Sequence, residues 1–267
     1  MNRVVLITGI SSGFGKEIAG HLAKNGYTVY GTVRKKIEPS PGIHLLLLDL
    51  TNNESIINAV NSVIEKEGRI DVLINNAGMH TGGSFETTPI ENVKLQIETN
   101  VIGLVNITRA VLPVMRQLRE GTIVNFSSIG GLMGLPFQSY YSASKFAIEG
   151  LSEALRMELR EFNIKVIVIN PGDFNTNNTS NRQKFIFDDI NDPYNKQFQK
   201  TLSIIEKDET GGWAPKIMAV KIQKIIESNN PNHHYFVASF EQKLAVTLKR
   251  ILPHKLFDLI LRSHYGL

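Results

Sequence analysis

Six apolar segments of strand length recur along the chain, and they constrain its fold more than any other feature. They read RVVLITG, YTVYGTV, IHLLLLDL, DVLINNAG, GTIVNFSS and IKVIVINPG. Each is nearly continuous in apolar residues, as expected of strands that are covered on both faces of a parallel sheet. Residues 13–25, 52–67, 89–118 and 139–162 have helical spacing. Strands alternating with helices predict right-handed crossovers and an α/β fold with a doubly wound parallel sheet.

The length of 267 residues suits one large α/β domain or two small ones. No linker, repeat or low-complexity run divides the sequence, so we expect a single domain over residues 1–267. Cysteine is absent, which excludes disulfides and thiolate chemistry and is typical of a reducing compartment. An apolar strand begins by Val4, and we see neither a leader nor an apolar run of transmembrane length, so we expect a cytoplasmic protein. The net charge of +4 is too small to indicate a nucleic-acid partner.

Three glycines follow the first strand in the segment TGISSGFG, residues 8–15. Doubly wound sheets bind ligands outside the carboxyl ends of their strands. Glycine lets the backbone approach a ligand closely, and the free N–H groups of the helix that follows suit a pyrophosphate. Glu17 after Gly15-Lys16 excludes a Walker A loop, and the glycine spacing also differs from G-x-G-x-x-G. The alternative is a tight strand-to-helix turn without a ligand.

Two phenols and one ammonium lie close together in the segment SYYSASKFAIEG, residues 139–150. In a helix, Tyr141 lies over Lys145, whereas Tyr140 lies over Ser144. A nearby positive charge favours the phenolate, so we expect Lys145 to lower the pKa of Tyr141 from about 10 towards the working range of a proton donor. Alone, this pattern more often marks an aromatic turn of a buried helix with a solvated lysine.

Further motifs give these residues a context. NNAG stands at residues 75–78, Asn100 lies in NVIG, Ser128 ends NFSS, and PGDFNT covers residues 171–176. Together with TGISSGFG and the Tyr141–Lys145 pair, and in the same order, they resemble the short-chain dehydrogenase/reductase family, especially its 17β-hydroxysteroid and retinol dehydrogenase-like branch. The resemblance spans residues 4–176. It implies a Rossmann fold, an NAD(P)(H) cofactor and hydride transfer between an alcohol and a carbonyl carbon.

The resemblance also implies four catalytic residues. Tyr141 would donate a proton to the carbonyl oxygen, or accept it from the alcohol, and Ser128 would hydrogen-bond to the same oxygen. Lys145 would shift the tyrosine pKa and bind the nicotinamide ribose, while Asn100 would hold a water beside Lys145. Ser127 is the neighbouring candidate, but in a strand it should point to the opposite face.

The implied cofactor contacts come from several strand ends. Asp49, with the Leu50 backbone, would bind the adenine, unless Asp49 is an ordinary helix N-cap. Thr176 would bind the nicotinamide carboxamide. The expected cofactor-binding residues are Gly9, Ser11, Ser12, Gly13, Phe14, Gly15, Arg34, Asp49, Leu50, Asn76, Ala77, Gly78, Tyr141, Lys145, Pro171, Gly172 and Thr176. No metal site is expected, because no carboxylate or further histidine stands at ligand spacing near His233 and His234.

Charge after the second strand favours NADP, although NAD remains possible. Val33 stands where NAD-binding folds usually carry an acid, and Arg34, Lys35 and Lys36 follow it. Arginine can bind a 2′-phosphate with two parallel hydrogen bonds, and Ser12 could add a hydroxyl. The alternative is a solvated basic loop.

The last third of the chain is less specific. Residues 173–212 are polar and irregular, and by resemblance they would form a substrate lid with short helices. Residues 240–262 predict an amphipathic helical extension, interrupted at Pro253, that could lie on an anionic membrane or pack over the active site or a partner subunit. Apolar candidates near an apolar substrate are Phe174, Phe185, Phe187, Tyr194, Leu135, Pro136 and Phe137; the stripe of the extension contains Phe240, Leu244, Leu248, Ile251, Leu252, Leu256, Phe257, Ile260 and Leu261.

The leading hypothesis is an NADP(H)-dependent oxidoreductase that acts on a small-molecule secondary alcohol or ketone. A nucleotide-sugar epimerase or dehydratase would carry a T-G-x-x-G-x-x-G turn and a larger C-terminal domain. A dinucleotide-sensing protein without catalysis would be expected to lack Tyr141, Lys145 or Ser128. The resemblance implies a homodimer or homotetramer built through the helices near Asn100 and Ser139. The apolar residues of those helices that need burial are Leu104, Val111, Leu151 and Leu155.

Overall fold

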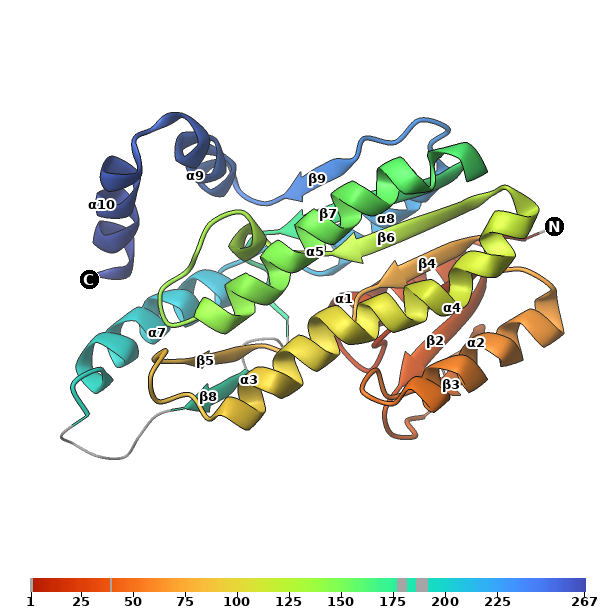
Figure 1. Ribbon diagram of the computed structural model, residues 1–267, viewed down its shortest axis with the longest axis horizontal. Helices are drawn as coiled ribbons and strands as arrows, with labels where there is room; N and C mark the ends of the chain where they lie inside the picture. The colour runs from red at the N-terminus through yellow and green to blue at the C-terminus, as the bar shows by residue number, and fades with distance from the viewer. Residues whose placement is uncertain (1, 39, 177–181, 186–191) are drawn as a thin grey trace.

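The computed structural model describes residues 2–38, 40–176, 182–185 and 192–267, with helices on both faces of a central sheet (Figure 1). Seven parallel strands pair in the order β3-β2-β1-β4-β6-β7-β9. Their bounds are β1 (Val4–Ile7), β2 (Thr28–Val33), β3 (Ile43–Leu47), β4 (Val72–Asn75), β6 (Gly121–Phe126), β7 (Ile164–Pro171) and β9 (His234–Val237). The predicted doubly wound parallel sheet is confirmed, and each of the six apolar segments supplies a strand.

The helices connect these strands and extend beyond them. They are α1 (Gly13–Lys24), α2 (Asn53–Glu67), α3 (Ile90–Ile97), the π-helical turn η1 (Glu98–Ile102), α4 (Gly103–Leu118), α5 (Ser139–Glu158), α7 (Asn195–Thr210), α8 (Lys216–Glu227), α9 (Phe240–Ile251) and α10 (His254–Tyr265). Two 3₁₀ turns are η2 (Ile129–Gly131) and η3 (Arg160–Phe162), and a small parallel pair joins β5 (Thr81–Gly83) to β8 (Gln183–Phe185).

Alternate residues of the strands pack against two different helix layers. Val5 and Ile7 of β1 belong to one core with α1 and α8, whereas Val4 and Leu6 belong to a second core with α2 and α4. All four side chains are buried. Because successive strand residues point to opposite faces, a sheet covered on both sides requires an apolar residue at every position. This explains the continuous apolar segments of the sequence.

The strand order reverses between β1 and β4, which places the loops after these strands at one crevice. Side chains join its two walls. The Thr8 hydroxyl oxygen accepts hydrogen bonds from the N–H groups of Asn76 and Ala77, each at 3.0 Å. Asn76 Nδ2 donates to the carbonyl oxygens of Thr8 and Gly9 at 2.9 and 3.0 Å. The start of the glycine turn is therefore fixed relative to the NNAG loop.

A third apolar core covers the carboxyl end of the sheet. It joins the loop after β6 to α7, α9 and α10 through residues such as Met133, Ile205 and Phe257. The expectation of short helices between residues 173 and 212 is wrong in length, because α7 has 16 residues. The interruption at Pro253 is confirmed, since α9 ends at Ile251 and α10 begins at His254. A lid over residues 173–212 stays a prediction, and Phe187 lies outside the described residues.

The elements α3, η1 and α4 form one continuous helix, Ile90–Leu118, that is long and apolar enough to cross a membrane by length and composition alone. The expectation that no apolar run reaches this length is therefore wrong. Within the fold α4 packs against α2, and its Ile107, Val111 and Met115 side chains are fully buried. One face of this helix therefore belongs to the core beside α2.

Candidate active site

A cleft of about 1080 Å³ runs along the carboxyl ends of the strands. It is lined by every predicted catalytic and cofactor-binding residue except Gly15 and Asn100. These two lie directly beneath its surface, where Gly15 packs against Gly9 and Asn100 bonds to Met79. The fold thus brings the predicted site residues together, although they are spread along the chain from residue 9 to residue 176.

The glycine turn forms part of the cleft wall. Gly9 and Gly13 have φ values of +73° and +57°, a region that disfavours side chains. A Cβ at Gly9 would lie 2.8 Å from Ala77 Cβ, and a Cβ at Gly15 would lie 2.2 Å from the Gly9 carbonyl oxygen. Gly9 and Gly15 are therefore required by close backbone approach, and Gly13 by its positive φ. A turn of this shape before the N-terminus of α1 suits a pyrophosphate, so these residues fit a dinucleotide.

Asp49 and Arg34 extend the cleft beyond the glycine turn. Asp49 Oδ1 accepts from the N–H and hydroxyl of Thr51 at 2.9 and 2.8 Å. The N-cap of α2 is Asn52, whose side chain accepts from the Ser55 N–H at 3.0 Å, so the helix-cap alternative for Asp49 is wrong. Arg34 is exposed and lines the cleft, whereas Lys35 and Lys36, also exposed, do not.

Tyr141 and Lys145 lie one turn apart on α5, as expected, with Lys145 Nζ 5.8 Å from the centre of the phenol ring. Lys145 Nζ donates to the Phe126 carbonyl oxygen at 2.7 Å. Burial raises the pKa of Tyr141, and a hydrogen bond with Ser128 only partly offsets this. The expectation that Lys145 lowers the pKa of Tyr141 is therefore not met in the protein without cofactor. Burial also lowers the pKa of Lys145 to about 8, against the opposing charge of Glu149.

The two serines after β6 have different partners. The Ser128 side chain hydrogen-bonds to Tyr141 and also accepts from the Gly130 N–H at 3.0 Å. The Ser127 hydroxyl donates instead to the Lys145 carbonyl oxygen at 3.3 Å. Ser128 is therefore the serine that lies next to the phenol oxygen, in agreement with the alternation of side chains along the strand.

Asn100 occupies the π-helical turn η1, where its side chain is buried. Its Oδ1 accepts from the Met79 N–H at 2.8 Å, and its Nδ2 donates to the Met79 carbonyl and to the Ser144 hydroxyl at 2.9 and 3.0 Å. A Cβ at Gly78 would lie 3.2 Å from Asn100 Oδ1. The π turn therefore connects the loop after β4 to the helix that carries Tyr141. Such turns often occur at functional sites.

His80 and Gln138 were not predicted, yet they hold the ring of Tyr141. The His80 imidazole stacks on the Tyr141 ring with 3.9 Å between centroids and 20° between planes. Its Nε2 donates to Gln138 Oε1 at 2.7 Å. Burial, with a smaller effect of Arg182, keeps the pKa of His80 well below its usual range, so the imidazole is neutral. The one feature of the sequence that could have indicated His80 is its position, as a polar aromatic residue two positions after NNAG.

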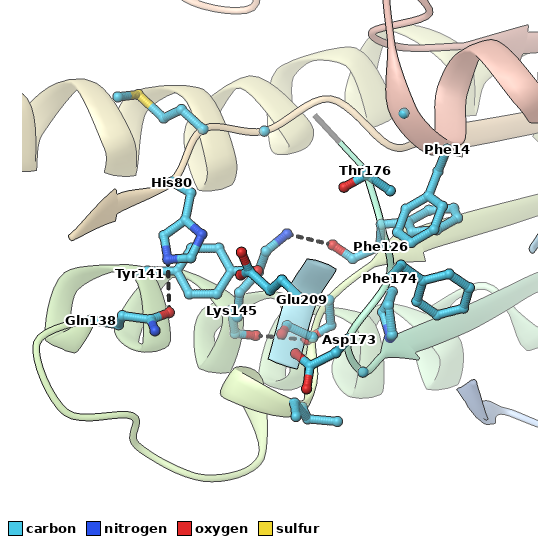
Figure 2. Close-up of a pocket in the computed structure, with 18 of the residues that line it drawn as sticks. Phe14, His80, Phe126, Gln138, Tyr141, Lys145, Asp173, Phe174, Thr176 and Glu209 are labelled. Carbon is cyan, nitrogen blue, oxygen red and sulfur yellow. Dashed lines mark hydrogen bonds between the residues drawn. The ribbon is translucent and has the colours of Figure 1, made fainter. Parts of the chain in front are cut away.

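A cluster of charged residues also lies at this end of the cleft, and the sequence did not predict it. Arg182 forms a buried ion pair with Glu209. Gln242 donates from its side chain to Asp173 Oδ2. Burial, together with the neighbouring Asp208 and Glu209 carboxylates, raises the pKa of Asp173 to about 7. Figure 2 shows Asp173 and Glu209 on the side of the cleft where Tyr141 and Lys145 lie.

The apolar candidates from the sequence divide into two groups. Phe174 and Leu135 line the cleft, and Phe174 packs edge-on against Phe14 with 4.8 Å between ring centres. Tyr194 points elsewhere, because its hydroxyl donates to Glu86 at 3.0 Å. The remaining described candidates, Pro136, Phe137 and Phe185, do not line the cleft.

The sequence is similar to known oxidoreductases along its whole length. A family model described as short chain dehydrogenase matches residues 3–186. A 3-ketodihydrosphingosine reductase of Bacteroides thetaiotaomicron is 46% identical over 265 residues, 99% of this chain and 98% of that protein. Estradiol 17-beta-dehydrogenase 2 of Mus musculus is 32% identical over 287 residues, 98% of this chain and 75% of that protein.

Solved structures resemble the fold. A short-chain dehydrogenase from Streptomyces avermitilis is 31% identical, with a TM-score of 0.83 over 100% of this chain and 96% of that one. The structure of ElxO with NADP bound is 27% identical, with a TM-score of 0.71 over 89% of this chain and 97% of that one.

Proposed function

This chain belongs to the short-chain dehydrogenase family, an NAD(P)-binding oxidoreductase family, and we propose that it interconverts a secondary alcohol and its ketone with NADP(H), chiefly in the reductive direction. The proposal depends above all on one observation. Ser128, Tyr141 and Lys145 meet in the same cleft as a glycine turn whose backbone suits a pyrophosphate. When it is bound, the nicotinamide supplies or accepts the hydride.

The side chains at the substrate end perform the proton chemistry. Tyr141 donates its proton to the carbonyl oxygen, and Ser128 hydrogen-bonds to the same oxygen as negative charge develops on it. Because burial raises the pKa of Tyr141, the phenol is protonated at neutral pH. A protonated phenol is ready to donate, which supports reduction of a ketone. His80 and Gln138 keep the ring in place by stacking and hydrogen bonding.

The cofactor would be held by residues on both sides of the crevice. The glycine turn with Ser11 and Ser12 would bind the pyrophosphate, Asp49 and Leu50 the adenine, and Thr176 the nicotinamide carboxamide. The Asn76, Ala77 and Gly78 loop would line the ribose side, and the turn at Pro171 and Gly172 would support the nicotinamide. Lys145 would bind the nicotinamide ribose, and Asn100 would stabilise this region through the Met79 backbone.

Arg34 is the residue that we expect to select NADP over NAD. Arg34→Ala should raise the KM for NADP by roughly tenfold or more and change the KM for NAD little, because only NADP carries the 2′-phosphate that a guanidinium binds. Steady-state assays with both cofactors measure the two constants. Lys35→Ala is a matched control, since this exposed cation does not line the cleft. Equal changes in both constants would contradict the role of Arg34.

We propose that the substrate is a long-chain ketone of the kind named for the Bacteroides relative, in which an amino group neighbours the carbonyl carbon. Apolar residues from α7, α9, α10 and the loop after η2 support this choice. Those that line the cleft include Met133, Leu135, Ile205, Phe257, Ile260 and Leu261. A fluorescence assay of NADPH oxidation tests this substrate class. The compounds compared are 3-ketodihydrosphingosine, a steroid ketone, retinal and a reducing sugar. Turnover of the sugar alone would contradict the proposal.

We propose that the exposed faces of α9 and α10 bind to the cytoplasmic surface of an anionic membrane. Only part of the predicted stripe is buried against the core, and Phe240, Ile251 and Leu259 are 75%, 68% and 62% exposed. Lysine and arginine outnumber acidic residues on these two helices. Ile260 is exposed and also lines the cleft, so the cleft opens beside this surface. A lipophilic substrate could then enter directly from the bilayer.

Sedimentation with phosphatidylglycerol vesicles tests this surface. Replacing Ile251 and Leu259 together by serine should lower vesicle binding by about tenfold or more, because two large apolar side chains no longer enter the bilayer. Leu47→Ser is the control, since Leu47 is 53% exposed on the edge strand β3. Unchanged vesicle binding, or dissociation of a protein dimer by the double substitution, would contradict membrane docking.

We also propose a homodimer formed through α4 and α5. Leu104 and Val111 are buried within the subunit, but Leu151 and Phe146 are 40% and 42% exposed on α5. A second copy would cover these apolar side chains. Light scattering measures the molar mass, and a monomer at micromolar concentration would contradict this assembly.

A further inference from the structure

We propose that Asp173 and Glu209 bind the protonated amino group of the substrate, and that Arg182 donates to a neighbouring hydroxyl oxygen. This inference rests on the proposed function and deepens it, because it assigns the polar headgroup of the substrate to named residues. The three side chains form what we call the headgroup subsite. It would make the enzyme select ketones that carry a cationic group beside the carbonyl.

The position of the headgroup subsite suits an amine next to the reacting carbon. Asp173 follows Gly172 directly after β7, and Glu209 lies in the last turn of α7. Both line the same cleft as Tyr141, and Figure 2 draws them in the same part of it. Glu209 is also close enough to raise the pKa of Tyr141. A carbonyl held by Tyr141 and Ser128 would therefore place an adjacent ammonium near these carboxylates.

The charges around the headgroup subsite leave negative charge that a ligand could neutralise. Within the described residues, the titratable and charged groups at this end include His80, Tyr141, Lys145, Asp173, Arg182, Asp208, Glu209, Glu241, His264 and Tyr265. Arg182 is paired with Glu209, and His264 lies 3.3 Å from Asp208. Asp173 is bonded to the neutral amide of Gln242 rather than to a cation.

The buried carboxylates of the headgroup subsite change the pKa values of neighbouring groups. Burial and the nearby Asp208 and Glu209 carboxylates raise the pKa of Asp173 to about 7. Burial, with smaller effects of these carboxylates and of Asp173, also raises the pKa of Tyr265. Like charges that are buried together disfavour ionisation, and a bound cation reverses this effect. An ammonium next to Asp173 would therefore be held most strongly when Asp173 is ionised.

Arg182 does not itself line the cleft, but it lies directly behind Glu209, which does, and it indicates that a polar group could be accepted here. Its side chain is 1% exposed, and its Nε and Nη1 have no hydrogen-bond partner within the part of the chain that the structure describes. It is close enough to influence the pKa of His80, Tyr141 and Asp173, all of which line the cleft. Buried donors without acceptors are costly. A hydroxyl oxygen of the headgroup would supply an acceptor.

Two ketones with the same chain and carbonyl position isolate the amino group. We compare 2-aminooctadecan-3-one with octadecan-3-one in NADPH oxidation and take the ratio of their kcat/KM values. In the wild type this ratio should favour the amino ketone, and in Asp173→Asn it should fall by about tenfold or more, because an amide cannot pair with an ammonium. Asp258→Asn is the matched control, since this exposed carboxylate on α10 does not line the cleft.

The possible outcomes separate this inference from the proposed function. If the wild type reduces both ketones but the ratio is the same in wild type and Asp173→Asn, the headgroup subsite is wrong and the proposed function stands. If the wild type reduces neither ketone, the proposed function itself fails.

A second measurement uses only the wild type and does not depend on how the variant folds. The inhibition constant of 2-aminooctadecan-3-ol should be at least about tenfold lower than that of octadecan-3-ol. Equal constants for the two alcohols would overturn the assignment.

Discussion

Tyr141→Phe is expected to lower kcat by about 10²–10⁴-fold while leaving NADPH affinity nearly unchanged. The substitution removes only the hydroxyl that donates the proton. The stacking of the ring on His80, with 3.9 Å between centroids, can persist because it does not use this hydroxyl. Stopped-flow and steady-state assays measure kcat, and NADPH fluorescence titration measures affinity. The result also separates a catalyst from a dinucleotide sensor, since a sensor would bind NADPH without any turnover to lose.

Tyr140→Phe is the matched control for this prediction. Tyr140 neighbours Tyr141 on α5, but its hydroxyl donates to the Phe85 carbonyl oxygen at 2.8 Å and its ring stacks on Phe85. It does not line the cleft, so we expect little change in kcat. A Tyr141→Phe enzyme with more than about a tenth of the wild-type kcat would contradict the assigned proton donor. So would a Tyr140→Phe enzyme that loses as much activity as Tyr141→Phe.

Gly15→Ala is expected to weaken NADPH binding by about 10²-fold, on the order of 3 kcal/mol. The added Cβ would lie 2.2 Å from the Gly9 carbonyl oxygen and 2.5 Å from Asn76 Nδ2. Backbone and a hydrogen-bonded amide must shift to relieve these contacts, which distorts both walls of the crevice. Fluorescence titration gives the dissociation constant, and circular dichroism verifies that the variant folds.

Gly20→Ala on the same helix is the control for Gly15→Ala. A Cβ at Gly20 meets no atom within 4 Å. Alanine is a better helix former than glycine, so this variant should bind NADPH normally and gain roughly 0.5–1 kcal/mol in the free energy of unfolding. Normal NADPH binding by folded Gly15→Ala would show that the glycine turn does not require the close approach seen here.

The sheet could be predicted because parallel strands leave a strong signal. Strands buried on both faces are apolar at every position, and they need helical crossovers between them. Both layers of the core contain the residues that this pattern requires, such as Ile7 on one face and Leu6 on the other. By contrast, α8 and the β5–β8 pair were missed, since neither follows from a continuous apolar strand segment or a family motif.

The predicted site residues share one cleft because they end strands or begin helices, positions that topology alone brings together. The headgroup subsite could not be predicted in this way. Arg182 and Glu209 meet only because β8 pairs with β5 and α7 covers the carboxyl end of the sheet. The direction of the Tyr141 pKa also required the structure, since helical spacing gives the neighbour of a phenol but not the extent of its burial.

Transfer of deuterium from labelled NADPH to a ketone tests the central claim most directly. The enzyme is mixed with NADPH deuterated at the nicotinamide C4 position and with 2-aminooctadecan-3-one, and the product is examined by mass spectrometry. We predict one deuterium on the carbinol carbon with the wild type, and formation of this product about 10²–10⁴-fold more slowly with Tyr141→Phe. An enzyme that binds NADPH but transfers no deuterium to this ketone, to octadecan-3-one, or to steroid and retinoid carbonyls would contradict the account.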